Sequence, residues 1–196
     1  MSIKASPRGL IEVAPPKILL HVCCGPCAAW PLKTLLSRLG AEKTIFWFYN
    51  PNIQPREEFI RRRDGAAYLA LEMPKRLGLS TNGLTLDFSP PYEPLKFLQA
   101  YAQSPSVPER CALCYSLRLT KAARRARELR ADAFTTSLLY SRRQKHELII
   151  QQGLAAAAEH GLDFYYQDFR QGWNEGIELS RDLDLYRQKS CGCVYE

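Results

Sequence analysis

Short apolar runs alternate along the chain with longer segments in which apolar residues recur at helical spacing. The short runs cover residues 17–22, 44–49, 84–88, 133–138 and 164–169, and their β-branched and aromatic content predicts buried strands. The longer segments cover residues 28–39, 56–77, 111–130 and 145–159, and we expect helices there. Strands that alternate with helices in this way predict an α/β fold with a doubly wound parallel sheet.

Length and composition are typical of a single domain. The chain has 196 residues, 46% of them apolar, which is enough for one sizeable core. We expect residues 17–196 to form this domain and the proline-containing residues 1–16 to form a flexible tail. No run approaches the roughly 18 apolar residues of a membrane span. The early apolar run ends after three residues at His21, too short for a secretory signal, so we expect a cytoplasmic protein without membrane contact.

All seven cysteines lie in three tight groups, which predicts a metal site. The groups are Cys23-Cys24-Gly25-Pro26-Cys27, Cys111-Ala112-Leu113-Cys114 and Cys191-Gly192-Cys193. Thiolates two or three residues apart can turn toward one metal, whereas disulfide partners usually lie far apart and come in even numbers. A tetrahedral zinc or a four-iron cluster takes four thiolates, so three remain for a second centre. Seven thiolates overfill a closed zinc site, and this favours iron–sulfur chemistry.

A thioredoxin-like dithiol is the competing interpretation of the first cysteine group. Cys24-Gly25-Pro26-Cys27 follows a predicted strand, as a C-x-x-C redox motif does. This interpretation accounts for two cysteines and leaves five unexplained, including the adjacent Cys23. Metal binding therefore explains the pattern better.

The second cysteine group lies on a predicted helix that also carries basic residues. At about 100° per residue, Cys111 and Cys114 share a face, and Arg118, Lys121 and Arg125 fall within roughly 80° of them. The chain has a formal net charge of +7, which suits a polyanionic partner such as nucleic acid. This basic face predicts contact with a phosphate backbone, although a solvated face of a surface helix has the same pattern.

The motifs of the chain, taken together, resemble the QueH-type epoxyqueuosine reductases. The segments that carry the resemblance are LLHVCCGPC (19–27), YNPNIQPREEF (49–59), RCALCYSLRL (110–119), FTTSLL (134–139), DFR (168–170) and LYRQKSCGC (185–193). Two positions depart from the family pattern. Ser190 stands where the family commonly has tyrosine, and Ser141-Arg142-Arg143 stands where it often has Ser-Pro-Tyr, which puts local substrate contacts in question but not the metal site.

The resemblance implies a Rossmann-like core similar to the nucleotide alpha-hydrolase-like enzymes, a 4Fe-4S cluster and a nearby mononuclear iron. It also implies reduction of the epoxide of epoxyqueuosine at the tRNA wobble position to queuosine, with electrons from an external donor. Four cluster ligands and three ligands of the single iron use all seven cysteines. Spacing does not decide the division. We expect Cys24, Cys111, Cys114 and one terminal cysteine at the cluster, and Cys23, Cys27 and the other terminal cysteine at the iron, where chemistry occurs.

Other polar and aromatic residues are candidates for substrate contact. Asp168 and Arg170 follow a predicted strand, where a proton donor and a phosphate contact would be placed, although a surface ion pair has the same pattern. We expect contacts to tRNA or the modified base from Tyr49, Asn50, Asn52, Arg118, Lys121, Arg125 and Arg170, with Tyr115 and Trp173 as further stacking candidates. The two asparagines are also typical turn residues, and His21 is expected to pack in the core.

Two other classes of function compete with the reductase. ATP-dependent tRNA-modifying enzymes on the same core carry Ser-Gly-Gly-x-Asp-Ser after the first strand to bind pyrophosphate. Here that position holds Cys-Cys-Gly-Pro-Cys, so an ATP-dependent reaction is not expected. A non-catalytic iron–sulfur redox protein, or a thiol–disulfide oxidoreductase that binds tRNA, stays open as the alternative.

Overall fold

The computed structural model describes residues 9–103 and 106–193, and its centre is one six-stranded parallel sheet. The strand order is β1-β6-β5-β2-β3-β4, and every pairing is parallel. The strands are β1 (Leu10–Ile11), β2 (Ile18–Val22), β3 (Thr44–Phe48), β4 (Thr85–Asp87), β5 (Ala133–Thr136) and β6 (Asp163–Tyr165). The parallel sheet expected from the hydrophobic pattern is therefore confirmed.

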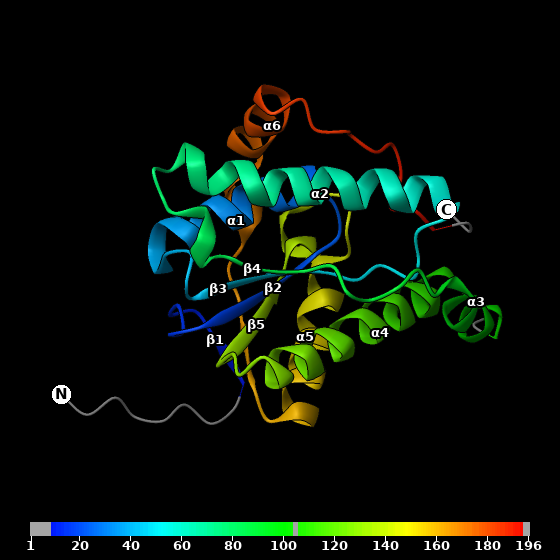
Figure 1. Cartoon of the computed structure of the whole chain (residues 1–196). Coiled ribbons are helices and arrows are strands. Elements are labelled where there is room, and N and C mark those ends of the chain that lie inside the picture. Colours follow the sequence, from blue (N-terminus) through cyan, green and yellow to red (C-terminus); the bar gives the residue numbers. More distant parts are fainter. Residues whose placement is uncertain (1–8, 104–105, 194–196) are drawn as a thin grey trace.

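Helices cover both faces of the sheet, as a doubly wound fold requires (Figure 1). One face carries α1 (Gly25–Leu39), α2 (Arg56–Arg76) and α6 (Trp173–Asp182), and the other carries α4 (Val107–Glu128) and α5 (His146–His160). The helix α3 (Pro94–Ala102) packs on α4 at the edge of this second layer. Three short 3-10 helices complete the described residues: η1 (Thr81–Gly83), η2 (Ser137–Tyr140) and η3 (Phe169–Gly172).

The core lies on both sides of the two central strands. All five residues of β2 and all five of β3 are buried, as expected for strands that are covered on both faces. On α4 the apolar stripe that includes Leu119, Ala123 and Ala126 is fully buried, so this side of the helix faces the sheet. The opposite side of α4 is therefore free to present other residues to the site.

The strand order places a topological switch point beside β2. The chain runs from β2 to β3 and β4 on one side, and then crosses back to β5 on the other side of β2. In such sheets the crevice outside the carboxyl ends of the two diverging strands is the usual ligand site. Here β2 ends directly before Cys23, and β5 ends directly before Ser137.

The fold differs from the sequence-based expectations in three respects. Leu10 and Ile11 pair with β6, so these two residues do not belong to a loose tail, while residues 1–8 lie outside the described part. Helices α3 and α6 were not predicted, because each is short and begins next to a proline or a glycine. The strands expected over 133–138 and 164–169 end early, at Thr136 and Tyr165, and the chain then turns into η2 and η3. No described helix is long and apolar enough to span a bilayer.

The glycines of α5 and α2 provide a matched test of the packing. A Cβ on Gly153 would lie 2.5 Å from the ring of Phe164, whereas a Cβ on Gly65 would meet nothing within 4 Å. We expect Gly153→Ala to lower the free energy of unfolding by about 1–3 kcal/mol, because the ring has to move. We expect Gly65→Ala to raise it by about 0.5–1 kcal/mol, because alanine restricts the unfolded chain. Denaturant unfolding of both variants checks the pair, and equal effects would contradict the packing described here.

Candidate metal centre in a thiol-lined cavity

A cavity of about 380 Å³ lies at the switch point and collects cysteines from all three sequence groups. Its wall combines the turn after β2, the first half of α4, the segment after η2 and the C-terminal segment. The cysteines in the wall are Cys23, Cys27, Cys111, Cys114, Cys191 and Cys193. The seventh, Cys24, lies beside Cys23 and is 1% exposed. The expectation that the three groups converge is therefore met.

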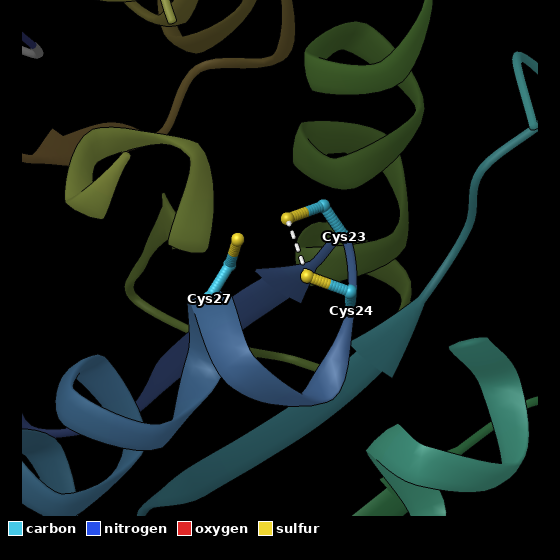
Figure 2. Close-up of side chains that lie close together, drawn as sticks. All are labelled: Cys23, Cys24 and Cys27. Atoms are coloured by element: carbon cyan, nitrogen blue, oxygen red, sulfur yellow. Dashed lines mark hydrogen bonds between the residues drawn. The ribbon is translucent and has the colours of Figure 1, made fainter. Parts of the chain in front are cut away.

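The first cysteine group forms a compact triad at the start of α1 (Figure 2). The sulfurs of Cys23, Cys24 and Cys27 all lie within 4.8 Å of one another, and the Cys23 and Cys24 sulfurs are 3.7 Å apart. Two thiolates bound to one tetrahedral metal at about 2.3 Å each would lie about 3.8 Å apart. The triad is thus pre-arranged at a spacing that suits a shared metal ion.

The three thiols of the triad compete for protons. Hydrogen bonds from Cys24 and Cys27, together with the nearby Arg118, hold the pKa of Cys23 well below its usual range. Burial raises the pKa of Cys24, and the hydrogen bond to Cys23 raises that of Cys27. The triad on its own therefore favours a single thiolate that two thiols stabilise. All three sulfurs can be thiolates at the same time only when a cation, such as a metal ion, is bound between them.

The second part of the thiol wall comes from α4 and the C-terminal segment. Cys114 is buried next to Tyr101 of α3, and the Cys193 thiol donates to the Tyr101 hydroxyl over 3.2 Å. Burial raises the pKa of Cys114 and outweighs the opposing effect of the nearby Arg118 guanidinium. The guanidinium of Arg118 approaches the Cys114 sulfur at 3.8 Å. Helix α3, absent from the sequence-based prediction, closes this side of the cavity.

Polar contacts hold the C-terminal cysteines against the rest of the fold. Arg62 of α2 is buried, and its guanidinium donates to the carbonyls of Cys191 at 3.0 Å and Ser190 at 3.3 Å. Its Nε pairs with Glu58 at 2.7 Å, and the other Glu58 oxygen accepts from the Tyr186 hydroxyl. A buried guanidinium with this many partners acts as a clamp on the segment.

Gly192 makes the clamp possible through its backbone conformation. Its φ is +95°, in a region that favours glycine, so the chain turns between Cys191 and Cys193. The Gly192 carbonyl accepts from the Gln54 backbone N–H at 3.0 Å. A Cβ at this position would lie 3.1 Å from both Arg62 and Ile53, so the glycine permits close approach to these residues.

Asn50 is a structural partner of Arg118. The Arg118 Nη2 donates to Asn50 Oδ1 over 2.7 Å, and Asn50 Nδ2 donates to the Val22 carbonyl over 2.8 Å. Both side chains are buried, and both line the cavity. Burial opposes the charge of Arg118, but the thiols of Cys114 and Cys23 raise its pKa. Arg118 therefore provides fixed positive charge between the two groups of cysteines.

His21 is a core histidine, as predicted. It is fully buried, and burial together with the nearby Arg118 lowers its pKa to about 3, so the ring is neutral. Nε2 donates to the Tyr49 carbonyl at 3.0 Å, and Nδ1 accepts from the Thr136 hydroxyl at 2.8 Å. The ring thereby links β2, β3 and β5 directly behind the cysteine triad.

The basic residues of α4 do not form one exposed stripe. Arg118 is 3% exposed, and its guanidinium donates to Asn50 and Cys114 inside the cavity. Arg125 pairs with Asp87 at 2.6 Å and with Glu128 at 2.9 Å. Lys121 is only half-buried on the same helix. Tertiary contacts therefore bury Arg118 and neutralise Arg125.

Asp168 and Arg170 bind each other outside the cavity wall. The Arg170 guanidinium makes two 2.7 Å contacts with the Asp168 carboxylate, and Asp168 also caps η3 by accepting from the Arg170 backbone. The hydrogen bonds from Arg170 lower the pKa of Asp168, so this carboxyl is ionised and does not hold a proton near neutral pH. Neither residue is among those that line the cavity. Tyr49 is likewise outside the wall and stacks on Trp47 with ring centroids 5.3 Å apart.

Three residues of the site were not singled out from the sequence. Gln188 donates to the Cys24 sulfur at 2.7 Å and to the Cys27 sulfur at 3.5 Å, and Arg62 and Tyr101 contact the C-terminal cysteines. Gln188 lies in the LYRQKSCGC motif, so the motif itself was a usable signal. Arg62 lies in a run of arginines, and nothing in that run distinguishes the buried one.

The triad geometry does not suit dithiol exchange. A thiol that attacks an external disulfide must be accessible and of low pKa. Cys24, the first cysteine of the C-x-x-C tetrapeptide, is 1% exposed, and burial raises its pKa. The sulfur with the lowered pKa belongs instead to Cys23, which lies outside that tetrapeptide.

The parallel α/β sheet with clustered thiols at its switch point defines a Rossmann-like protein with a candidate metal centre. The sequence profile of the family "Epoxyqueuosine reductase QueH" matches residues 18–196. Curated relatives with that name include proteins from Dehalococcoides mccartyi (34% identical, 92% of each chain covered) and Thermotoga maritima (33% identical, covering 91% of this chain and 88% of the relative). The chain belongs to the epoxyqueuosine reductase QueH family.

The buried Arg62 and the exposed Arg63 provide a matched test of the C-terminal clamp. Arg62→Ala removes hydrogen bonds from a charged donor, worth about 1.5–3 kcal/mol each. We expect amide hydrogen exchange in residues 186–193 to accelerate at least about tenfold, and the protein to retain less metal. The Arg63 side chain is 43% exposed and pairs with the exposed Asp64, so Arg63→Ala should leave the exchange rates unchanged. Exchange in Arg62→Ala at the rate of the unaltered protein would show that the clamp is dispensable.

Proposed function

We propose that this chain reduces the epoxide of epoxyqueuosine at the wobble position of tRNA and so forms queuosine. Membership of the epoxyqueuosine reductase QueH family supports this activity. The observation that carries the proposal in this chain is the convergence of all three cysteine groups on one cavity. The reaction takes up two electrons and two protons, breaks both C–O bonds of the epoxide and leaves an alkene and water. We propose an external low-potential donor for the electrons and the cytoplasm as the location.

The thiols suit the metal centres that this reaction needs. A 4Fe-4S cluster transfers electrons singly, and an iron with an open position polarises the substrate oxygen. We assign Cys111 and Cys114 to the cluster and Cys23 and Cys27 to the single iron, with Cys24 and the two terminal cysteines completing the two sets. The spacing of the triad sulfurs and the lowered pKa of Cys23 support metal binding there. The charge of Arg118 offsets the negative charge of thiolates on both sides.

The chain's own residues make the cavity attractive to an anionic substrate. The described residues of its wall include five cationic side chains and no carboxylate. These cations are Arg62, Arg118, Arg143, Lys145 and Arg187. Opposite charge concentrates a polyanion at the opening and steers it inward. Asp168, paired with Arg170 elsewhere, has no part in this proposal.

We assign the contacts to the RNA backbone to the mouth of the cavity. Arg143, Lys145 and Arg187 line the cavity and are also exposed, so they lie where it opens to solvent. Trp173 stacks on Tyr140 in the same wall, with ring centroids 5.1 Å apart, and the Arg142 guanidinium lies over the Trp173 ring at 5.2 Å, so a base turned out of its stack would compete with Arg142 for this ring. We propose the residues at the mouth as the phosphate contacts in place of Arg118, Lys121 and Arg125 of α4. Of those three, Arg118 is buried and Arg125 is paired with carboxylates, so Lys121 is the member that can still contact a phosphate.

A turnover assay with a matched carboxylate variant tests the function. Anaerobic protein should hold about five irons and four sulfides per chain. With epoxyqueuosine-containing tRNA and a low-potential reductant, it should convert the nucleoside to a product lighter by one oxygen. Cys111→Ser should lose sulfide and turnover, whereas Asp168→Asn should retain turnover because this carboxylate lies outside the cavity wall. Fully loaded protein that leaves the epoxide intact, or sulfide-free protein that binds only zinc, would contradict the proposal.

Salt dependence of tRNA binding tests the assignment of phosphate contacts. We expect Arg143→Ala and Arg187→Ala each to reduce the slope of log K against log salt by about one phosphate. Arg125→Ala should not, since this side chain already pairs with Asp87 and Glu128. Arg130 is exposed and precedes β5, at the opposite edge of the sheet, so Arg130→Ala is the matched control. If Arg125→Ala alone reduces the slope, the phosphate contacts lie on α4 and not at Arg143 and Arg187. The measurement uses unmodified tRNA and is independent of turnover.

A further inference from the structure

Two carboxamide side chains in the cavity wall share an unusual arrangement: the nitrogen is anchored and the oxygen has no partner. Asn52 Nδ2 donates to the Cys191 carbonyl over 3.3 Å, and the side chain is 2% exposed. Gln188 Nε2 donates to the Cys24 and Cys27 sulfurs. Asn52 Oδ1 and Gln188 Oε1 are both buried, and neither has a hydrogen-bond partner among the described residues.

The anchored nitrogens determine which way each amide faces. A carbonyl oxygen can only accept, and the Cys24 and Cys27 sulfurs can only accept once a bound metal has displaced their protons, so in the metal-loaded protein each must face the N–H side of the amide. Turning either amide over would give up that hydrogen bond and set two acceptors against each other. The oxygens are therefore held in place. Buried acceptors without partners are rare because their lost hydration is not replaced, so their presence in a ligand cavity points to a donor that arrives with the ligand.

Other amides in the same wall show the contrast. Asn50 uses both its oxygen, toward Arg118, and its nitrogen, toward Val22. Gln144 accepts from the Tyr115 hydroxyl over 2.6 Å. The partnerless oxygens of Asn52 and Gln188 are thus a property of these two positions and not of amides in the cavity in general.

We propose that Asn52 Oδ1 and Gln188 Oε1 accept hydrogen bonds from O–H or N–H groups on the substituent of the modified base. They would thereby select the modified nucleoside against guanosine. This inference rests on the proposed function. An epoxide oxygen can only accept, so these two oxygens do not bind it; the complementary donor in the wall is Arg118, whose Nε is buried and also has no partner among the described residues. A site that hydrogen-bonds a substrate group rejects analogues that lack the group, because its own polar atoms then stay unpaired.

Equilibrium binding without reductant tests the proposal. The metal-loaded protein is titrated with tRNA that carries epoxyqueuosine and with the same tRNA that carries guanosine at the wobble position. The variants are Gln188→Met and Asn52→Leu, which remove the amide and approximately keep the volume, with Gln144→Met as the matched control. Metal content and circular dichroism are measured for each variant. The unaltered protein should prefer the modified tRNA by at least about a hundredfold.

Each variant that removes a free oxygen should weaken binding of the modified tRNA about tenfold, with little change for the guanosine tRNA. Gln144→Met should leave the preference unchanged. Equal affinity of the unaltered protein for the two tRNAs overturns the proposal, and this measurement does not depend on any variant folding. The proposal is also overturned if Gln188→Met and Asn52→Leu still prefer the modified tRNA as strongly as the unaltered protein does. In that case ordered water, and not the substrate, satisfies the two oxygens. Failure of the proposed function gives a different result: the protein binds the modified tRNA selectively, but the epoxide stays intact after incubation with reductant.

Discussion

The thiol-lined cavity depends on the parallel pairing of β2 with β5. This pairing brings the carboxyl ends of both strands to one edge, and the strand order reverses between them. The Cys23 N–H donates to the Ser137 hydroxyl, which in turn donates to the Cys23 sulfur, so two segments 114 positions apart meet at that edge. The neutral ring of His21 reinforces the junction from within the sheet. The remaining walls, from α4 and the C-terminal segment, converge on this edge.

The site also depends on buried positive charge, which needs partners to be stable. Arg62 is matched by Glu58 and by two backbone carbonyls, and Arg118 is matched by Asn50 and by nearby sulfurs. A buried charge without such partners would be strongly unfavourable. Both arginines therefore hold distant segments together. Arg118 also stabilises negative charge on the nearby sulfurs of Cys23 and Cys114.

The two departures from the family pattern lie on the same cavity. Ser141, Arg143 and Ser190 all line it, while every cysteine and the clamp residue Arg62 are in place. Ser141 and Arg143 contribute no sulfur and make no contact with the terminal cysteines in the bonds described here, whereas Ser190 Oγ accepts from the Gly192 N–H over 3.2 Å, between Cys191 and Cys193.

The sequence by itself determined the alternation of strands and helices and the burial of β2 and β3, because both follow from local hydrophobicity. It also determined the three cysteine groups, whose close spacing indicates metal binding. Only the tertiary structure decided which polar residues face the cavity. Asp168 follows a strand in the sequence, yet η3 turns it toward Arg170. Arg118 and Arg125 share a helix face, yet one is buried against Asn50 and the other is paired with Asp87. Spacing within one element is a local property, whereas burial and pairing depend on partners far away in the chain.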